Sequence, residues 1–320
     1  MKNGSQTQIL MLENRSLRSF RNNMEHRKAK KIFTNYLFVL PAVLLFCTFH
    51  LYPFVNVFRY SLFQWDGIVP FSSAQFVGLA HFKDIFTANP QWWYSMWHAF
   101  YITLLTLIFQ NGLALLLALT CDRAIKGAKA YRMIFFLPPV LSGIVVGLIW
   151  QWIYDGNYGL LNYWLTNIGL GHLSRAWLAD PNTSLTCVGI VHMWKGFGWG
   201  FIILLAGLQS IPRELYEAAK VDGAGAWDTF RRVTVPLMVP VFVLVTILTI
   251  LNTMQIYDLI VSLTGGGPGY HTEVPITRIL AAMRGGSRLG YACALGIVFG
   301  LMLLVVSFIQ IQASKLAKQE

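Results

Sequence analysis

Hydrophobic residues along the chain are gathered into six long runs, and the stretches between them hold most of the charged residues. A helix needs about 20 mostly apolar residues to cross a bilayer core, because only an internally hydrogen-bonded backbone leaves no bare polar groups in hydrocarbon. Each run is long enough. We therefore predict an all-α polytopic membrane protein with six transmembrane helices, over Ile32–Tyr52, His98–Cys121, Met133–Tyr154, Leu185–Leu208, Val235–Val261 and Tyr291–Ile311. We expect Pro138 and Pro139 to kink the third of these helices.

Composition supports a membrane protein and excludes several other classes. Only 12% of the 320 residues are charged and 55% are apolar, whereas about 25% of an ordinary globular domain is charged. A disordered protein, a small disulfide-rich protein and a typical soluble enzyme do not have this composition. The cysteines Cys47, Cys121, Cys187 and Cys293 lie far apart without a metal-binding spacing, so we expect free thiols and no metal site.

Basic residues are distributed unevenly between the loops. Eighteen of the 25 Lys and Arg residues lie in the two termini and the loops after the second and fourth runs, six lie in the other loops, and Lys195 lies within the fourth run. This asymmetry predicts a multi-pass membrane protein with both termini in the cytoplasm. It also accounts for the net charge of +11 without a nucleic-acid partner. Residues 1–31 form a basic cytoplasmic tail facing lipid headgroups, 32–313 the transmembrane domain, and 314–320 a short cytoplasmic tail.

The chain lacks the motifs of an enzyme or of an ATPase. There is no phosphate-binding G-x-x-x-x-G-K-[ST] loop, no H-E-x-x-H and no G-x-S-x-G, so we expect no catalytic site and no cofactor bound by this chain. An ion-coupled secondary carrier is the main alternative for function, and within the runs only Lys195 and Asp258 are deep ionisable candidates for it. A membrane enzyme acting on lipid-linked sugars would need clustered carboxylates or histidines, which the sequence does not show.

The loop over residues 209–235 has a helix–turn–helix pattern. Ser210 is a suitable cap, Pro212 suits a first helical turn, and acidic residues follow near the positive end of the helix dipole. Gly223 and Gly225 permit the positive φ that turns the chain. A second short helix follows, and we expect Pro236 to close it. The loop is thus predicted to form two short helices joined by a glycine turn.

The first of these helices carries residues suited to docking. Ala218 and Ala219 are small enough for a partner backbone to come close, and Glu217 and Lys220 offer charged contacts at the edge. An amphipathic helix lying in the lipid headgroups is the alternative interpretation, and the pattern alone favours neither.

At these residues the sequence resembles the membrane subunit of binding-protein-dependent ABC importers. Further matching segments include Phe136-Leu-Pro-Pro, Ala206-Gly-Leu-Gln-Ser-Ile-Pro and Leu263-Thr-Gly-Gly-Gly-Pro-Gly. Together they are similar to the sugar branch, which contains the larger maltose permease subunit and the glycerol-phosphate permease subunit. The residues to which the resemblance gives an ATPase-coupling role are Glu217, Ala218, Ala219, Lys220, Asp222, Gly223, Ala224, Phe230 and Pro236.

The resemblance implies a type I importer fold, a location in a bacterial plasma (inner) membrane, and several partners. The loop over 209–235 would be a coupling helix seated in a separate ATPase subunit, which uses ATP and Mg²⁺. One chain has one such loop, so two ATPase subunits imply a second, related permease and a heterodimer. An extracytoplasmic solute-binding protein would deliver the solute, with Gly265, Gly266, Gly267 and Pro268 as a flexible candidate contact. An ordinary turn explains that segment equally well.

Solute contacts are expected from polar and aromatic side chains deep in the spans. Amides suit the donors and acceptors of sugar hydroxyls, and aromatic faces cover their C–H surfaces. The candidates are Asn252, Gln255, Tyr257, Trp194 and Lys195. Hydrogen bonds between helices explain the two amides nearly as well, and snorkelling or a structural hydrogen bond explains Lys195. We expect Gln110 and Asn111 to serve packing, and the pattern does not identify the sugar or polyol phosphate carried.

Overall fold

A computed structural model of the protein describes residues 34–122, 127–284 and 288–316, which belong to two compact units, up to Arg59 and from Tyr60 onward. The predicted basic tail over residues 1–31 lies outside the described residues. In the first unit a helix begins at Thr34, includes a π-helical turn (η1, Cys47–Leu51), and continues as α2 (Tyr52–Ser61). Span one therefore extends past the predicted end at Tyr52.

The predicted all-α polytopic architecture is confirmed. Within the described residues, five helices are long and apolar enough to cross a membrane, over Thr34–Ser61, Pro90–Asp122, Ser184–Gln209, Ala226–Met254 and Leu289–Gln312. The third predicted span is a bent pair, Ala130–Val140 and Gly143–Ile153, with an angle of 95° between its halves. Counting the pair as one span gives six.

The bend in span three follows the two prolines. Helix α6 (Ala128–Val140) contains Pro138 and Pro139, and the chain turns before α7 (Gly143–Ile153) begins. Proline lacks a backbone N–H, so neither residue can donate the helical hydrogen bond to the carbonyl four residues earlier. The predicted kink is therefore a bend close to a right angle.

Span two is one long helix with a π-helical turn at its centre. It comprises α4 (Pro90–Leu105), the π-helical turn η3 (Thr106–Gln110) and α5 (Asn111–Asp122). It starts earlier than the predicted His98 because Asn89 caps it: the Asn89 Oδ1 accepts the Trp92 N–H at 3.0 Å, and Pro90 occupies the first turn.

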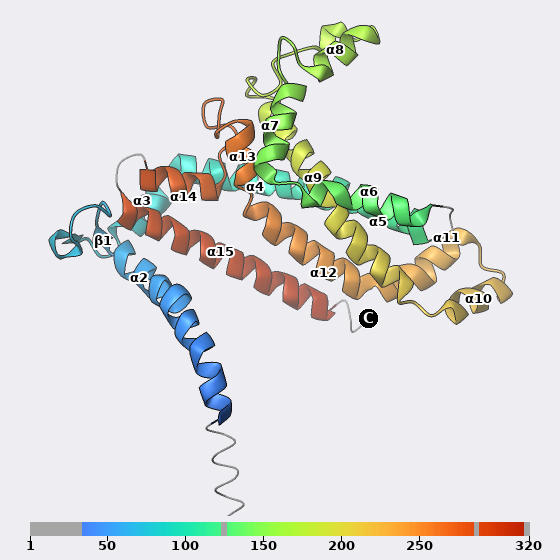
Figure 1. Cartoon of the computed structure of the whole chain (residues 1–320), viewed down its shortest axis with the longest axis horizontal. Coiled ribbons are helices and arrows are strands. Elements are labelled where there is room, and N and C mark those ends of the chain that lie inside the picture. The colour runs from blue at the N-terminus through green and yellow to red at the C-terminus, as the bar shows by residue number, and fades with distance from the viewer. Residues whose placement is uncertain (1–33, 123–126, 285–287, 317–320) are drawn as a thin grey trace, which may run out of the picture. The chain divides into compact units, whose positions relative to one another are not determined.

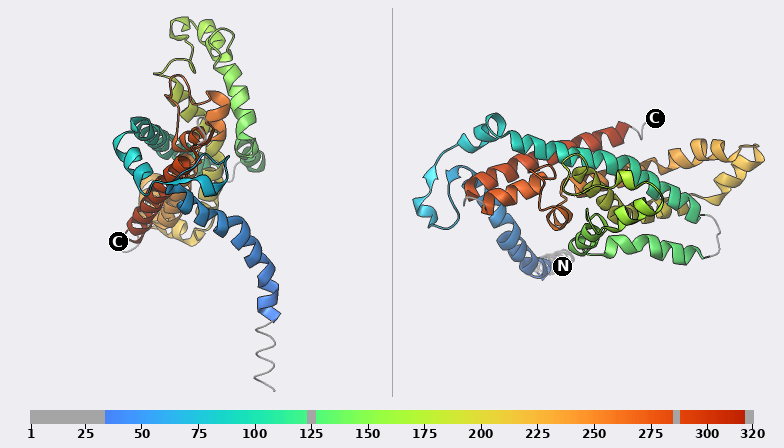
Figure 2. Two further views of the ribbon diagram at one scale, coloured as in Figure 1. Left: turned by 90° about the vertical axis from the view of Figure 1, so that its left-hand side faces the viewer. Right: turned by 90° about the horizontal axis from the view of Figure 1, so that it is seen from above.

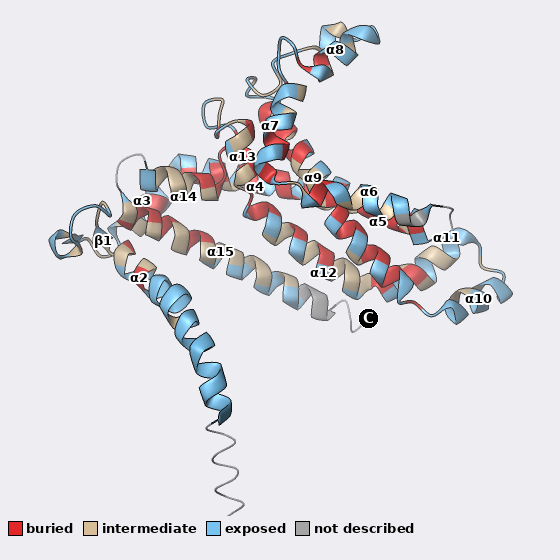
Figure 3. Ribbon diagram, in the orientation of Figure 1, coloured by how far each residue is buried: buried red, intermediate tan, exposed pale blue. Residues whose placement is uncertain are grey.

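Span four forms the centre of the second unit. Helix α9 (Ser184–Gln209) agrees with the predicted Leu185–Leu208 and packs against α5, α6 and the span-five helix α12 (Val235–Met254). Figure 3 shows buried residues along α9 and α12. One apolar core gathers Trp92, Ile102, Val188 and Leu295, and a second core gathers Ala114, Phe201, Leu204 and Met238.

Span five differs from the prediction at both ends. It begins as α11 (Ala226–Thr229) and passes through a π-helical turn (η5, Phe230–Thr234) into α12 without ending at Pro236. The expectation that Pro236 closes a separate short helix is wrong: the proline follows directly on the π-helical turn η5, and the helix continues through it to Met254. The chain then breaks at Gln255, and a six-residue helix α13 (Asp258–Leu263) follows.

The two ends of the second unit carry different loops. The hairpin of β1 (Phe63–Gln64) and β2 (Gln75–Phe76) lies at one end, together with the helix α3 (Ala80–Thr87), the last turn of α14 (Pro275–Arg284) and the first turn of α15 (Leu289–Leu316). The short antiparallel ladder pairs Phe63 with Phe76 and Gln64 with Gln75. Helix α10 (Arg213–Val221) lies at the opposite end in two views (Figures 1 and 2).

A small lobe projects between spans three and four. It contains α8 (Leu160–Asn167) and the 3₁₀ turn η4 (Gly171–Leu173), and it stands away from the long helices in Figures 1 and 2. The buried Asn162 carboxamide holds it together by donating to the carbonyls of Gly156 and Arg175 and accepting the Trp177 Nε1–H at 2.7 Å.

Candidate functional site

A cavity of about 510 Å³ opens between spans two, four and five. Gln110 of η3 contributes to one wall, and α9 and α12 contribute most of the rest. The break after α12 and the first residues of α13 complete the lining. The lining residues are Gln110, His192, Lys195, Gly196, Trp199, Gly200, Ile203, Val245, Leu248, Thr249, Asn252, Thr253, Gln255, Ile256, Asp258 and Leu259.

Each long helix presents one face to the cavity. On α9 the lining side chains recur at helical spacing, from His192 through Lys195 and Trp199. On α12 Thr249 and Asn252 follow the same spacing. Residues three and four apart share a helix face. The cavity wall therefore combines polar side chains from one face of each helix with apolar ones such as Ile203, Val245 and Leu248.

A chain of hydrogen bonds joins the three spans at the cavity wall. The fully buried Thr106 hydroxyl donates to the Ile102 and Thr103 carbonyls, at 3.0 and 2.8 Å. Its oxygen then accepts from the Thr253 hydroxyl at 3.3 Å, and Thr253 accepts from His192 Nε2 at 3.1 Å. This order follows because a hydroxyl has one proton to give. In a neutral His192 ring, Nδ1 is consequently the acceptor.

Charged side chains of opposite sign line the cavity without pairing. Asp258 Oδ1 accepts the Leu259 N–H at 2.9 Å, and the carboxylate packs against the Cα of Gly143 in α7. Lys195 makes no hydrogen bond or ion pair with any residue in the described part of the chain. The Lys195 amino group, the Asp258 carboxyl group and several amide and hydroxyl groups of the lining are thus separate contact points for a solute.

The segment predicted to couple to an ATPase, residues 209–235, contains a short exposed helix that ends in a glycine turn. Helix α10 has no buried residue, with Glu214 in its first turn and Lys220 in its last. After Asp222 the chain turns at Gly223, whose φ is +77°. The Gly223 N–H bonds to the Lys220 carbonyl at 3.1 Å and the Ala224 N–H to the Ala219 carbonyl at 2.9 Å. This pair of bonds is the Schellman motif, which needs a left-handed residue at the glycine position.

Most of the predicted coupling residues lie on the surface of this segment. Glu217, Ala218, Lys220, Asp222, Gly223 and Pro236 are exposed, and Ala219, Ala224 and Phe230 are half-buried. Apolar side chains are exposed beside them: Val221 is 88% and Trp227 70% accessible. The Tyr216 hydroxyl lies 3.2 Å from that of Thr234, which ties α10 to the start of span five.

Two details of the predicted loop are wrong. Ser210 ends α9, and its hydroxyl donates to the Gly207 carbonyl at 2.7 Å, so Pro212 and not Ser210 stands at the cap of α10. Gly225 has a φ of −70° and lies before α11 in an extended conformation. Only Gly223 uses the positive φ that was expected of both glycines, because one residue in that conformation completes the turn.

A model of binding-protein-dependent transport system inner membrane components matches residues 27–315. The chain belongs to this family. It is 33% identical over 287 residues to the probable ABC transporter permease protein YurN of Bacillus subtilis, covering 89% of this chain and 97% of that one. It is 32% identical over 248 residues to the trehalose/maltose transport system permease protein MalF of Thermococcus litoralis, covering 78% and 81%.

A solved structure shares the fold as well. A chain of a bacterial ABC transporter involved in the import of the acidic polysaccharide alginate superposes with a TM-score of 0.79 at 25% identity, over 90% of this chain and 97% of that chain. The resemblance to importer permeases predicted from the sequence is therefore confirmed.

Of the five residues predicted to contact the solute, three line the same cavity. Asn252, Gln255 and Lys195 line it. Trp194 points elsewhere, with its ring 5.7 Å from that of Trp150 in α7, and Tyr257 lies in the break between α12 and α13 outside the lining.

Among the polar lining residues, His192, Thr249, Thr253 and Gln110 were not predicted as solute contacts. His192 lies one turn before Lys195, so the helical spacing would have found it. Gln110, which was expected to serve packing, lines the cavity. The expectation holds for Asn111, whose Oδ1 accepts the Thr249 hydroxyl at 3.1 Å.

The glycine-rich loop after α13 is held by hydrogen bonds. Gly265 and Gly266 have φ of +61° and +95°, and the Thr272 hydroxyl donates to the Gly267 carbonyl at 2.7 Å. Gly266 is buried, Gly267 and Pro268 are half-buried, and Gly265 is exposed. The predicted flexible contact is therefore an ordered turn with part of its surface accessible.

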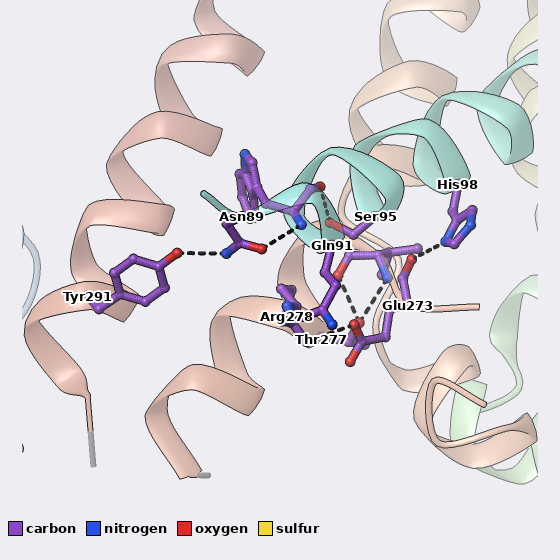
Figure 4. A network of polar contacts seen from close by, with 10 residues as sticks. Asn89, Gln91, Ser95, His98, Glu273, Thr277, Arg278 and Tyr291 are labelled. Carbon is purple, nitrogen blue, oxygen red and sulfur yellow. Dashed lines mark hydrogen bonds and ion pairs between the residues drawn. The ribbon is translucent and has the colours of Figure 1, made fainter. Parts of the chain in front are cut away.

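A polar network fixes the neighbouring end of span two (Figure 4). His98 Nδ1 lies 2.8 Å from the Glu273 carbonyl oxygen, and Arg278 Nη1 bonds Glu273 Oε2 at 3.2 Å. The Asn89 Nδ2 donates to the Tyr291 hydroxyl at 2.6 Å. Burial raises the pKa of the Glu273 carboxyl, and Arg278 opposes that rise. The network joins α4, α14 and α15 into one block.

Proposed function

We propose that this chain is the permease subunit of an ATP-binding-cassette importer and forms half of the membrane pathway for a carbohydrate. The observation that carries the proposal is the cavity between spans two, four and five, with the amides of Asn252 and Gln255 on its wall. Amides offer donors and acceptors side by side, as sugar hydroxyls do. The side chain of Trp199 adds an aromatic face at the same cavity.

The names of related proteins support a carbohydrate as the solute. One relative is the trehalose/maltose permease, and another is the arabinooligosaccharides transport system permease protein AraP of Bacillus subtilis, 31% identical over 291 residues. The cavity of about 510 Å³ lies within the range of sites that take small solutes.

We infer that α10 and the Gly223 turn couple the pathway to a separate ATPase subunit, which uses ATP and Mg²⁺. The support is the exposure of α10, its apolar neighbour Val221 and its place at the end of the unit away from the β1–β2 hairpin. In this arrangement α10 and both chain termini are cytoplasmic, as the basic loops predict. A second, related permease would supply the other coupling helix. An extracytoplasmic binding protein would deliver the solute at the opposite end.

Transport by the complete complex tests the proposal. The chain, its partner permease and its ATPase subunits are reconstituted in proteoliposomes, with the binding protein outside and ATP inside. We expect uptake of a radiolabelled sugar that requires enclosed ATP, stops with a catalytically inactive ATPase subunit, and continues in the presence of a protonophore. Uptake that ignores ATP and collapses with the protonophore would instead identify an ion-coupled carrier.

A further inference from the structure

Gln110 has a buried carboxamide without a structural partner. The residue is 7% exposed and lines the cavity, and its Oε1 is buried with no hydrogen-bond partner. Its Nε2 makes no hydrogen bond with any other residue in the described ranges. Buried polar groups are nearly always hydrogen-bonded, because an unpaired group loses its hydrogen bonds to water and gains none from the protein.

The backbone around Gln110 holds the carboxamide in that place. Gln110 is the last residue of the π-helical turn η3, which begins at Thr106. Thr106 anchors the turn through its bonds to span two carbonyls and to Thr253. A π-helical turn shifts the following side chains around the helix axis and occurs often at functional sites.

Gly196 provides the space that the carboxamide occupies. A Cβ added at Gly196 would lie 2.5 Å from Gln110 Oε1, 3.0 Å from Cδ and 3.2 Å from Nε2. Any side chain at position 196 would therefore displace the Gln110 carboxamide. Gly196 of span four and the unpaired Gln110 carboxamide of span two therefore lie against each other where the two spans pack.

Asn111, the next residue in the helix, has a side-chain amide that serves packing between spans. Asn111 Oδ1 accepts the Thr249 hydroxyl and is absent from the cavity lining. Gln110 and Asn111 are adjacent and carry the same functional group, yet only Asn111 makes a hydrogen bond between spans. An apolar residue of similar volume at position 110 would pack without an unpaired polar atom.

We propose that Gln110 is a specificity-determining residue whose carboxamide turns from Gly196 toward the cavity and binds the solute through two neighbouring hydroxyl groups, one donating to Oε1 and one accepting from Nε2. The inference rests on the proposed function and extends the solute site to span two. A carboxamide matches a vicinal diol because both present a donor and an acceptor in one plane. The solute supplies the hydrogen bonds that the protein leaves unmade.

The test compares Gln110→Met with Asn111→Ala in the reconstituted importer, using radiolabelled maltose, trehalose and arabinotriose as probes. We expect Gln110→Met to raise KM for the transported probe about tenfold, which corresponds to the loss of two hydrogen bonds. Its melting temperature should stay unchanged or rise. Gly196→Ala should raise KM in the same direction. Asn111→Ala should lower the melting temperature and leave KM within about twofold.

Monodeoxy derivatives of the transported probe identify the contact directly. For the wild type, removal of one of the two contacted hydroxyls should raise KM, and in Gln110→Met the same removal should have no further effect. If Gln110→Met keeps the wild-type KM, or only loses thermal stability, Gln110 is structural and this inference is overturned. If the wild type takes up none of the three probes with ATP, the proposed carbohydrate function is refuted. The inference about Gln110 rests on that function and is then refuted as well.

Discussion

Substitution of Gly223 isolates the contribution of the turn after α10. The residue stands at the left-handed position of the Schellman motif with φ of +77°, and nothing lies within 4 Å of an added Cβ. Gly223→Ala therefore introduces backbone strain without a steric clash. For an L-residue the left-handed conformation costs about 1–2 kcal/mol, and for the β-branched Gly223→Val about 1–3 kcal/mol.

This strain shifts the turn away from the conformation that presents α10. One to two kcal/mol corresponds to a factor of about 5 to 30 in population. We expect solute-stimulated ATP hydrolysis to fall by that factor in Gly223→Ala and further in Gly223→Val, with normal membrane insertion. Gly223→Asn should recover most of the activity, because asparagine tolerates the left-handed region.

Gly225 provides the matched control two residues away. It also has open space at its Cβ position, but its φ of −70° is available to any residue. Gly225→Ala should keep wild-type hydrolysis and wild-type co-purification with the ATPase subunits. If Gly223→Val docks and stimulates hydrolysis as the wild type does, or if both alanine variants lose activity alike, the account of the turn is wrong.

Three further substitutions probe the packing of the second unit. Asn162→Ala should cost the outer lobe about 2 kcal/mol, since the Trp177 Nε1–H loses its acceptor, and hydrogen exchange there should accelerate. Arg278→Met removes the group that opposes the raised pKa of Glu273, so the stability deficit should be small in acid and grow as pH rises through that pKa, in thermal melts at several pH values. Gly147→Val should lower thermal stability in detergent by about 1–3 kcal/mol, because its Cβ position overlaps the Ser262 side chain.

Hydropathy located the spans because apolar length is a property of sequence alone. The fourth span was predicted within one residue at each end, since charged or turn-forming residues flank it. The predicted start of span two, His98, lies eight residues after the observed start at Pro90. The cap by Asn89 and Pro90 was the signal that could have corrected this.

Breaks inside spans were harder to predict, because apolar content does not depend on helix direction. Pro138 and Pro139 marked the bend in span three, although not its 95° angle. Span five breaks at Gln255 without a proline or glycine, so local propensity gave no signal. There the half-helices α7 and α13 pack together, with Gly143 and Gly147 facing Asp258 and Ser262, and tertiary packing decides the conformation.

The continuous helix through Pro236 places α10 close in sequence to the helices of the cavity. Because helix runs unbroken from Ala226 to Met254, span five begins three residues after the Gly223 turn. On the other side, α9 reaches Gln209, four residues before α10. A 26-residue helix such as α9 is about 39 Å long and moves as a stiff rod. A force on α10 is therefore transmitted to α9 and to span five, the two helices that contribute most of the cavity lining. Relative motion of those helices would change the distance between Lys195 and Asn252.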